Sequence, residues 1–378
     1  ADNPAPPSKS ASGQLVWSTI ADSGIGSGFN AGNLCCGAKM MSVVETLFKP
    51  THAGGPATPL LAKTWELDST NSPPKYVDVT IESGIMFHGG YGELTADDLV
   101  WNINDTNPNL SETLGTGNIS ITDGSGTWAG FLGANATEKT GDYSVRINWE
   151  SFDPRWDTWF FGQDGLGAGI VSKNAYDTEG EEWNQDQLIG TGPFEMTSWQ
   201  RGDRAVFTAV DNHWRQTPEV TSITRIAVPD ETVRLAQLAT GDADIADVSI
   251  SNVSEAQRIG MTAKGSGAAR MVTMMFAGNL WETNHPTSGE ELDIVTYTHD
   301  LPWLGNPHKP ADSNNPAGMD DMEQARLVRQ ALAMSIDRDL INEAALSGLG
   351  WPVYIPYFDI NNPNWDDKWK IEYDPDGA

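Results

Sequence analysis

The chain has 378 residues, 39% of them hydrophobic and 15 of them tryptophan, so it is long enough for two or three folded domains and too apolar to be disordered. Its 52 acidic residues against 23 lysines and arginines give a formal charge of -29, which argues against partners that need a basic surface, namely nucleic acids and anionic membranes. We interpret the acidic excess as a solvated surface suited to high salt, with a preference for cationic ligands as the alternative.

The first hundred residues alternate between strand and helix patterns. Residues 14–20 (QLVWSTI) are typical of a strand, and a glycine-rich loop over 22–33 leads to an expected helix near 38–48. Short strands with a hairpin are expected over 64–100, and they end in a helix over 96–103.

The next segment is less regular. Residues 104–133 are rich in Asn, Gly, Ser and Thr, which predicts a segment that wraps the surface. Residues 143–149 alternate as a further strand, and 153–161 (DPRWDTWFF) are dense in aromatic side chains.

Residues 190–247 carry the most informative order of elements. A tight turn at 190–193 precedes a half-buried strand over 204–210, and His213 and Trp214 follow in a loop. Ile223, Ile226 and Val228 predict a second, more buried strand. Asp230 is the expected N-cap of a helix that ends at Gly241, after which the chain returns to the sheet.

The last third contains one expected strand and two expected helices. Residues 271–276 are interpreted as the strand, and residues 322–335 and 337–346 as two consecutive helices. Asp337 is the expected N-cap of the second helix, and Gly348 its stop signal.

The 190–247 pattern resembles the signature of the family 5 extracellular solute-binding proteins of ABC importers, the oligopeptide- and dipeptide-binding relatives. The ordered matches are the GTGPF turn at 190–194, Trp199, the loop at 212–214, Pro-Asp at 229–230 and the exit at 241–245. Further matches are PLLAKTWE at 59–66, FHGG at 87–90, LTADDLV at 94–100, RLVRQALAMSIDR at 326–338 and YDP at 373–375.

The chain also departs from the family pattern. The arginine that usually precedes the FHGG block is missing from residues 81–84, and Gly89 stands where the family has an aspartate. Members normally continue well beyond the YDP motif, and in peptide-binding relatives the aspartate that holds the ligand's amino group lies in that later part. We therefore expect lobe II of this chain to be incomplete.

The resemblance implies an α/β fold of the periplasmic binding protein type, with two mixed α/β lobes around a hinged ligand cleft (class II, cluster C type) and an extra subdomain. No internal repeat is evident, and the alternation of helices and strands agrees with mixed lobes around a cleft. The expected division is a disordered leader at 1–13, lobe I at 14–48 and 190–275, the extra subdomain at 49–189, and lobe II at 276–378.

Candidate ligand contacts follow from aromatic side chains and from the family's cleft positions. Flat aromatic rings in a cleft can stack on sugars or pack around peptide side chains, although core packing is favoured for any single tryptophan. The loop after the first strand and the segment after Phe276 correspond to cleft positions in the family. The predicted ligand-binding residues are Phe29, Asn30, Asn33, Trp156, Asn279 and Trp281.

No pattern points to catalysis, a metal or a cofactor. The sequence contains no G-x-S-x-G, P-loop or dinucleotide fingerprint, and its six histidines include no tight ligand pair. Cys35 and Cys36 are adjacent, so they are expected to be two small buried residues, with a rare vicinal disulfide as the alternative. We expect no enzyme activity, no catalytic residues, no metal site and no cofactor.

The resemblance implies an extracytoplasmic protein, periplasmic or secreted, that captures peptides by lobe closure and delivers them to an ABC permease in the membrane. A monomer is expected, associated with the membrane only through the transporter, since no apolar run approaches the roughly 20 residues of a membrane span. Alternatives are an oligosaccharide or a nickel chelate as ligand and, in a different class, a secreted hydrolase or a ligand sensor outside transport.

Overall fold

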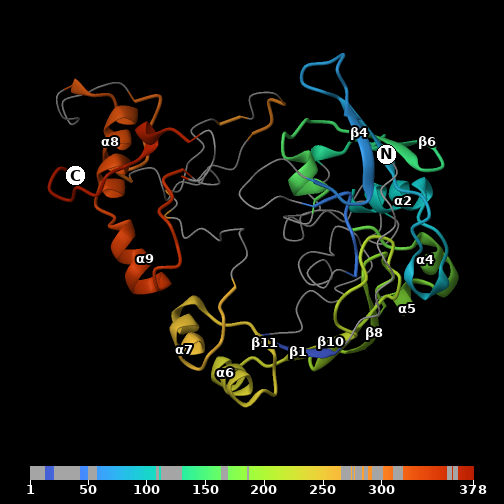
Figure 1. Ribbon diagram of the computed structural model, residues 1–378. Coiled ribbons are helices and arrows are strands. Elements are labelled where there is room, and N and C mark those ends of the chain that lie inside the picture. Colours follow the sequence, from blue (N-terminus) through green and yellow to red (C-terminus); the bar gives the residue numbers. More distant parts are fainter. Residues whose placement is uncertain are drawn as a thin grey trace. The chain divides into compact units, whose positions relative to one another are not determined.

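The computed structural model divides into two compact units (Figure 1). Unit 1 comprises Ala1–Ser249 with Ile259–Met261, and unit 2 comprises Ile250–Arg258 with Thr262–Ala378. The domain boundaries expected from the sequence stay predictions. The structure describes residues 13–20, 43–49, 58–107, 110–111, 130–162, 169–184, 187–264, 274, 276, 283–284, 288–291, 301–309, 318–355, 360 and 365–378.

A mixed five-stranded sheet of unit 1 has the order β11-β1-β10-β9-β8. The first strand runs parallel to its two neighbours, β10 and β11, whereas β8, β9 and β10 pair antiparallel. The start of the chain is therefore an interior strand of a sheet whose other members come much later. The bounds are β1 (Gln14–Thr19), β8 (Phe194–Gln200), β9 (Arg204–Ala209), β10 (Ser222–Ala227) and β11 (Ile245–Ala246).

Helix α6 (Glu231–Thr240) packs against β1 and β11 of this sheet. Its N-cap is Asp230, whose Oδ1 accepts from the backbone N–H groups of Thr232 and Val233 at 2.8 and 3.2 Å. Gly241 ends the helix with φ 80°, a left-handed conformation that favours glycine. The predicted cap, helix, stop and return to the sheet are confirmed.

The expectation that β10 is the more buried strand is wrong. Its side chains are partly exposed except for Arg225, which is 7% exposed, while β9 buries Ala205 and Phe207 completely or nearly so. The Arg225 guanidinium lies over the ring of Trp17, with 5.7 Å between the guanidinium carbon and the ring centroid. Apolar side chains at 223, 226 and 228 therefore do not identify the buried face of this strand.

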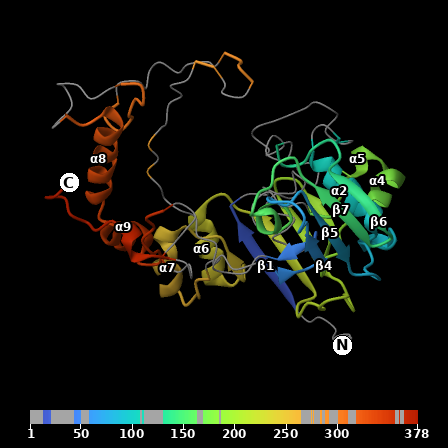
Figure 2. The ribbon, with the colours of Figure 1, turned by 90° about the horizontal axis from the view of Figure 1, so that it is seen from above.

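A second, antiparallel sheet has the order β4-β5-β7-β6, and helix α2 (Ala96–Thr106) packs against β6 and β7 (Figure 2). Burial alternates along β5 and β7 with the period of two that a one-sided sheet requires. The hairpin, the helix and the later strand expected here are confirmed. The strand bounds are β4 (Ala62–Leu67), β5 (Tyr76–Ile81), β6 (Thr137–Gly141) and β7 (Ser144–Asn148).

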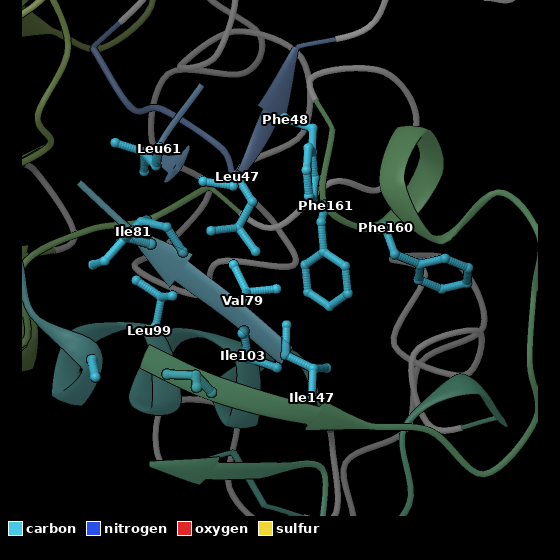
Figure 3. Close-up of a cluster of buried hydrophobic side chains, with 14 of the residues drawn as sticks. Leu47, Phe48, Leu61, Val79, Ile81, Leu99, Ile103, Ile147, Phe160 and Phe161 are labelled. Atoms are coloured by element: carbon cyan, nitrogen blue, oxygen red, sulfur yellow. The ribbon is translucent and has the colours of Figure 1, made fainter. Parts of the chain in front are cut away.

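The core of this region is filled from several directions (Figure 3). Leu99 and Ile103 extend from α2, while Val79 and Ile147 extend from the facing strands. Leu47 and Phe48 enter from the preceding segment, and each of these six side chains is at most 1% exposed. Burial of such aliphatic and aromatic groups stabilises by about 1.5–3 kcal/mol each.

The expected helix near 38–48 is wrong for its described part, residues 43–48, which form bends and an isolated bridge at Glu45 before the strand that begins at Phe48. Val43 O accepts from Gly192 N at 3.0 Å, and Phe48 N donates to Phe161 O at 3.0 Å. These backbone groups bond to distant segments of the chain instead of to each other in a helix. All six side chains are buried, which removes the periodicity that distinguishes helix from strand. The segment ends in β2 (Phe48–Lys49), which pairs with β3 (Thr58–Pro59).

The expectation that 104–133 wraps the surface is wrong for several described positions. Asn107 and Leu132 are fully buried, and Phe131 stacks on Phe160 with 3.9 Å between ring centroids. Short helices complete the described part of unit 1. They are η1 (His88–Gly90), the π-helical turn η2 (Trp156–Phe160), α4 (Lys173–Glu179) and α5 (Glu181–Asn184).

In unit 2, α8 (Asp321–Met334) and α9 (Arg338–Leu346) confirm the two predicted helices. Asp337 caps α9, and a positive φ at Ser347 and Gly348 ends it. Of the strand expected at 271–276, only Met274 and Phe276 are described, and neither lies in a strand. The remaining short helices here are η3 (Ile250–Asn252), α7 (Val253–Arg258) and η6 (Asp367–Trp369).

Candidate functional site

The GTGP turn at 190–193 contacts the non-helical segment that begins at Val43. A Cβ added to Gly190 would lie 2.1 Å from the Val43 carbonyl oxygen, so a larger residue cannot occupy this position without moving backbone. Gly192 N donates to the same oxygen at 3.0 Å. The glycines of the turn therefore allow its backbone to lie against the backbone of Val43.

Two histidines hold the carbonyl groups of this turn. His213 Nε2 donates to Thr191 O at 2.8 Å, and His88 Nε2 donates to Gly192 O at 2.7 Å. Because a carbonyl only accepts, both Nε2 atoms carry a proton. His213 Nδ1 accepts from the N–H groups of Arg215 and Gln216 at 3.3 and 3.2 Å, so that ring is in its neutral form.

Glu45 binds the side chains around the same turn and is only 1% exposed. Its Oε2 accepts from Thr191 Oγ1 at 3.1 Å and from Trp214 Nε1 at 3.2 Å. Its Oε1 accepts from Arg215 Nη2 at 2.6 Å, which pairs the buried carboxylate with a cation. The turn cluster is defined here as Glu45, His88, Thr191, His213, Trp214 and Arg215.

Burial sets the charge of both histidines. It lowers the pKa of His213 to about 4, an effect that the hydrogen bond to Thr191 O partly opposes. Burial also lowers the pKa of His88, against the hydrogen bond to Gly192 O. Both rings are neutral at neutral pH, and Glu45 has its oxygens engaged. The turn cluster is thus suited to holding backbone, because it offers no free nucleophile beside an available base.

The predicted ligand-binding residues are not brought together by the described structure. Five of them, Phe29, Asn30, Asn33, Asn279 and Trp281, lie outside the described residues, as do Cys35 and Cys36. Trp156 is described and is 4% exposed. Its ring meets Phe48 edge-on with 5.3 Å between centroids. This burial favours packing, the role weighed against ligand contact for any single tryptophan.

An acidic hollow of about 320 Å³ lies on unit 1 beside α2 and α4. Its four carboxylates already have partners. Asp97 accepts from Lys139 Nζ and Asp177 from Lys173 Nζ. Asp98 accepts from the N–H groups of Thr95 and Lys173, and Glu93 from Gly84 N and Tyr143 Oη. These bonds explain the acidic residues as local structure rather than as a cation site.

The described residues contain neither a metal-binding cluster nor a membrane-spanning helix. No group of three or more His, Cys, Asp or Glu side chains among them is arranged to hold a metal ion. Within the same residues, no helix has the length and apolar character that a membrane crossing requires.

The FHGG block at 87–90 and the loop at 212–214, which the sequence separates, meet in this structure at the GTGP turn, and comparison with known proteins identifies the pattern. The family model "Bacterial extracellular solute-binding proteins, family 5 Middle" matches residues 57–378. The chain belongs to this family.

Relatives of this family 5 protein include peptide-binding proteins. The oligopeptide-binding protein AppA of Bacillus subtilis (strain 168) is 25% identical over 310 residues, which are 78% of this chain and 46% of the relative. The alignment thus spans about half the length of that relative. The dipeptide-binding protein of Escherichia coli (strain K12) is 29% identical over 82 residues, 21% of this chain and 15% of the relative.

Solved structures confirm the fold class. The structure of AppA from Bacillus subtilis with a nonapeptide has a TM-score of 0.58 at 22% identity, over 97% of this chain and 62% of that one. DppA from Helicobacter pylori with the peptide STSA has a TM-score of 0.61 at 18% identity, over 97% and 64%. The α/β fold of the periplasmic binding protein type is therefore confirmed for this family 5 protein.

Sequence reasoning missed that the family motifs meet in space. The sequence analysis notes only that the six histidines include no tight ligand pair, whereas His88 and His213 bind the same turn, and His88 is 104 residues from Gly192 along the chain. The signal that could have found them was present, because each histidine lies inside a motif block. For predicting that a histidine has a structural role, its position inside a family motif is more informative than its distance along the chain from other histidines.

Proposed function

We propose that this family 5 protein captures peptides outside the cytoplasm by closing two lobes around them and delivers them to an ABC permease. The observation that carries the proposal is the match to the family over residues 57–378, with a 310-residue alignment to an oligopeptide-binding relative. The likeness to two peptide-bound structures over 97% of this chain supports the same ligand class.

The proposed mechanism is reversible binding without covalent chemistry. Closure of a cleft expels water, so backbone groups of a peptide must exchange water for donors and acceptors on the cleft walls. Asparagine amides supply both kinds of group, and aromatic rings pack on peptide side chains. We therefore propose Phe29, Asn30, Asn33, Asn279 and Trp281 as contacts, with recognition of the closed form by the permease coupling occupancy to uptake.

Ligand titration tests the class of ligand. Intrinsic fluorescence of the protein is followed while peptides of two to nine residues, oligosaccharides and a nickel–histidine complex are added in turn. We expect a saturable change with peptides alone. Saturation only by a sugar or the nickel complex would replace peptide with that ligand class, and loss of intact peptide, followed by mass spectrometry, would contradict binding without turnover.

Substitution tests the proposed contacts. Trp281→Phe and Asn279→Ala are expected to weaken peptide binding about tenfold each, the effect of losing about 1.4 kcal/mol of contact energy. The matched control is Trp351→Phe, a partly exposed tryptophan of unit 2. Equal affinity of the Trp281 variant and the control would remove that residue from the proposed site.

A further inference from the structure

The turn cluster lies where the chain passes between two hydrophobic clusters of unit 1. One cluster contains Val43, Val44 and Leu188, and the other contains Leu47 and Ile189, so the chain crosses from one to the other on both sides of the turn contact. Glu45 lies within the first crossing, and the GTGP turn directly follows the second. The polar contacts of the turn cluster thus join two apolar bodies.

We propose that His88 and His213 form an acid-sensitive clamp: proton uptake by these two side chains releases the GTGP turn from the segment around Glu45 and loosens the joint between the two hydrophobic clusters. The proposal does not depend on the identity of the ligand. Its basis is the geometry of two rings, each donating to a different carbonyl of one turn.

His213 is the more constrained of the two rings. A proton on Nδ1 removes the acceptor for the N–H groups of Arg215 and Gln216, both of which would then face a donor. Arg215 is also the partner of Glu45. Protonation of one ring therefore disturbs both the loop that carries Trp214 and the ion pair that holds the buried carboxylate.

His88 has a different weakness. Its Nδ1 is buried and has no hydrogen-bond partner, so a proton there would be an unsatisfied buried donor on a charged ring that is 7% exposed. The charged and titratable groups that act on His88 are Glu45, which favours its protonation, and His213, which opposes it. A charge on His213 therefore opposes protonation of His88, and Arg215 opposes protonation of His213, while the clamp is closed.

Linkage fixes the direction of the effect. The closed clamp holds neutral rings, whereas released histidines titrate near 6.5, so the released state binds more protons at low pH. The pKa of about 4 for His213 means that this ring alone favours release about 20-fold more at pH 5 than at pH 7, and the lowered pKa of His88 adds to that factor. The clamp is stable above about pH 6.5 and weakens as the pH falls towards 4. Released carboxylates titrate near pH 4, so the interval from pH 7 to 5 isolates the histidines.

Hydrogen exchange of the whole protein, corrected for the intrinsic rate at each pH, tests the clamp. The reporting peptides cover 187–194 and 210–217, and the reference peptide covers α6. We expect opening of the first two peptides to rise at least about 20-fold between pH 7 and pH 5, with α6 unchanged. A rise of the same size in all three peptides, or none in the first two, would overturn the proposal.

Variants attribute the rise to the histidines. The double variant His88→Gln with His213→Gln keeps two side-chain N–H donors and cannot titrate, so it is expected to lose the rise. Exposed His308→Gln in unit 2 is the matched control and is expected to retain it. If the double variant does not fold, His88→Gln alone replaces one side-chain N–H donor by another and is expected to reduce the rise in opening between pH 7 and pH 5. A pH dependence of hydrogen exchange equal to that of the unchanged protein would contradict the clamp.

Discussion

The two units bury their apolar side chains to very different extents. The described residues of unit 1 contain two hydrophobic clusters fed by two sheets and several helices. Among the described residues of unit 2, only Ala256 and Ala325 are buried hydrophobic side chains. The exposed large hydrophobic residues of unit 2 include Met322, Leu327, Leu340, Ile341, Leu349 and Tyr373.

The difference shows that a sequence can form amphipathic helices without those helices burying their apolar faces in a hydrophobic core. Helices α8 and α9 have their caps, their i to i+3 ion pair between Glu323 and Arg326, and their stop signals. These local features fix each helix as a helix, because they depend only on neighbours in the sequence. An apolar helix face stabilises a fold only when another layer covers it, which α2 achieves in unit 1.

The largest expected contrast comes from one substitution made in both units. Leu99→Ala in α2 removes a side chain that is 0% exposed and should cost about 2–5 kcal/mol of unfolding free energy. Leu340→Ala in α9 changes a side chain that is 58% exposed and should cost at most about 0.5 kcal/mol. Urea unfolding followed by circular dichroism measures both. Equal costs would break the comparison and show that the α9 face is covered in solution.

A glycine substitution tests how closely unit 1 is packed around the GTGP turn. Gly190→Ala places a methyl group 2.1 Å from the Val43 carbonyl oxygen and should cost about 3 kcal/mol, since neither backbone segment can move freely. Gly130→Ala is the matched control, because nothing lies within 4 Å of its added Cβ. Thermal unfolding measures the midpoint temperature of both variants. Equal midpoints would mean that the backbone around the turn shifts at little cost to accommodate the methyl group.

Helix caps allow a smaller and more local comparison. Ser172 caps α4, is fully buried and accepts from Ala175 N at 3.1 Å, so Ser172→Ala leaves a buried N–H unsatisfied and should cost about 2 kcal/mol. Asp337→Ala in α9 exposes the corresponding N–H to water and should cost about 1 kcal/mol. Hydrogen exchange of each helix reports the loss. The reverse order would contradict the view that burial makes the unit 1 cap the stronger one.

The smallest expected effect concerns the charge that both units share. Acidic residues outnumber basic ones in each unit, and the chain as a whole carries a formal charge of -29. Raising the ionic strength from 0.1 to 1 M shortens the screening length from about 10 to about 3 Å, which should weaken the repulsion and raise Tm. Calorimetry at several NaCl concentrations measures this. An unchanged or lower Tm would count against a surface suited to high salt.

Prediction from the sequence succeeded where the information is local and failed where burial is complete. Asp230, Gly241 and Asp337 were identified because a cap needs only a side chain and its next few residues. The segment at 43–48 is not the helix that the sequence predicts, because all six of its side chains are buried and no polar face distinguishes a helical period. For the candidate site, the motif blocks were found, whereas five of the six predicted ligand contacts stay predictions.

The sequence by itself determined the strands and helices with clear periodicity, the caps that bound them, and the family. Each of these depends on residues that are close together or in a fixed order along the chain. Only the tertiary structure decided that Glu45, His88 and His213 meet at one turn, that β10 buries an arginine rather than its isoleucines, and that Trp156 packs in a core. The physical reason is that a side chain's environment depends on which distant segments pack against it. That packing is settled by the burial of the whole unit and not by a residue's neighbours along the chain.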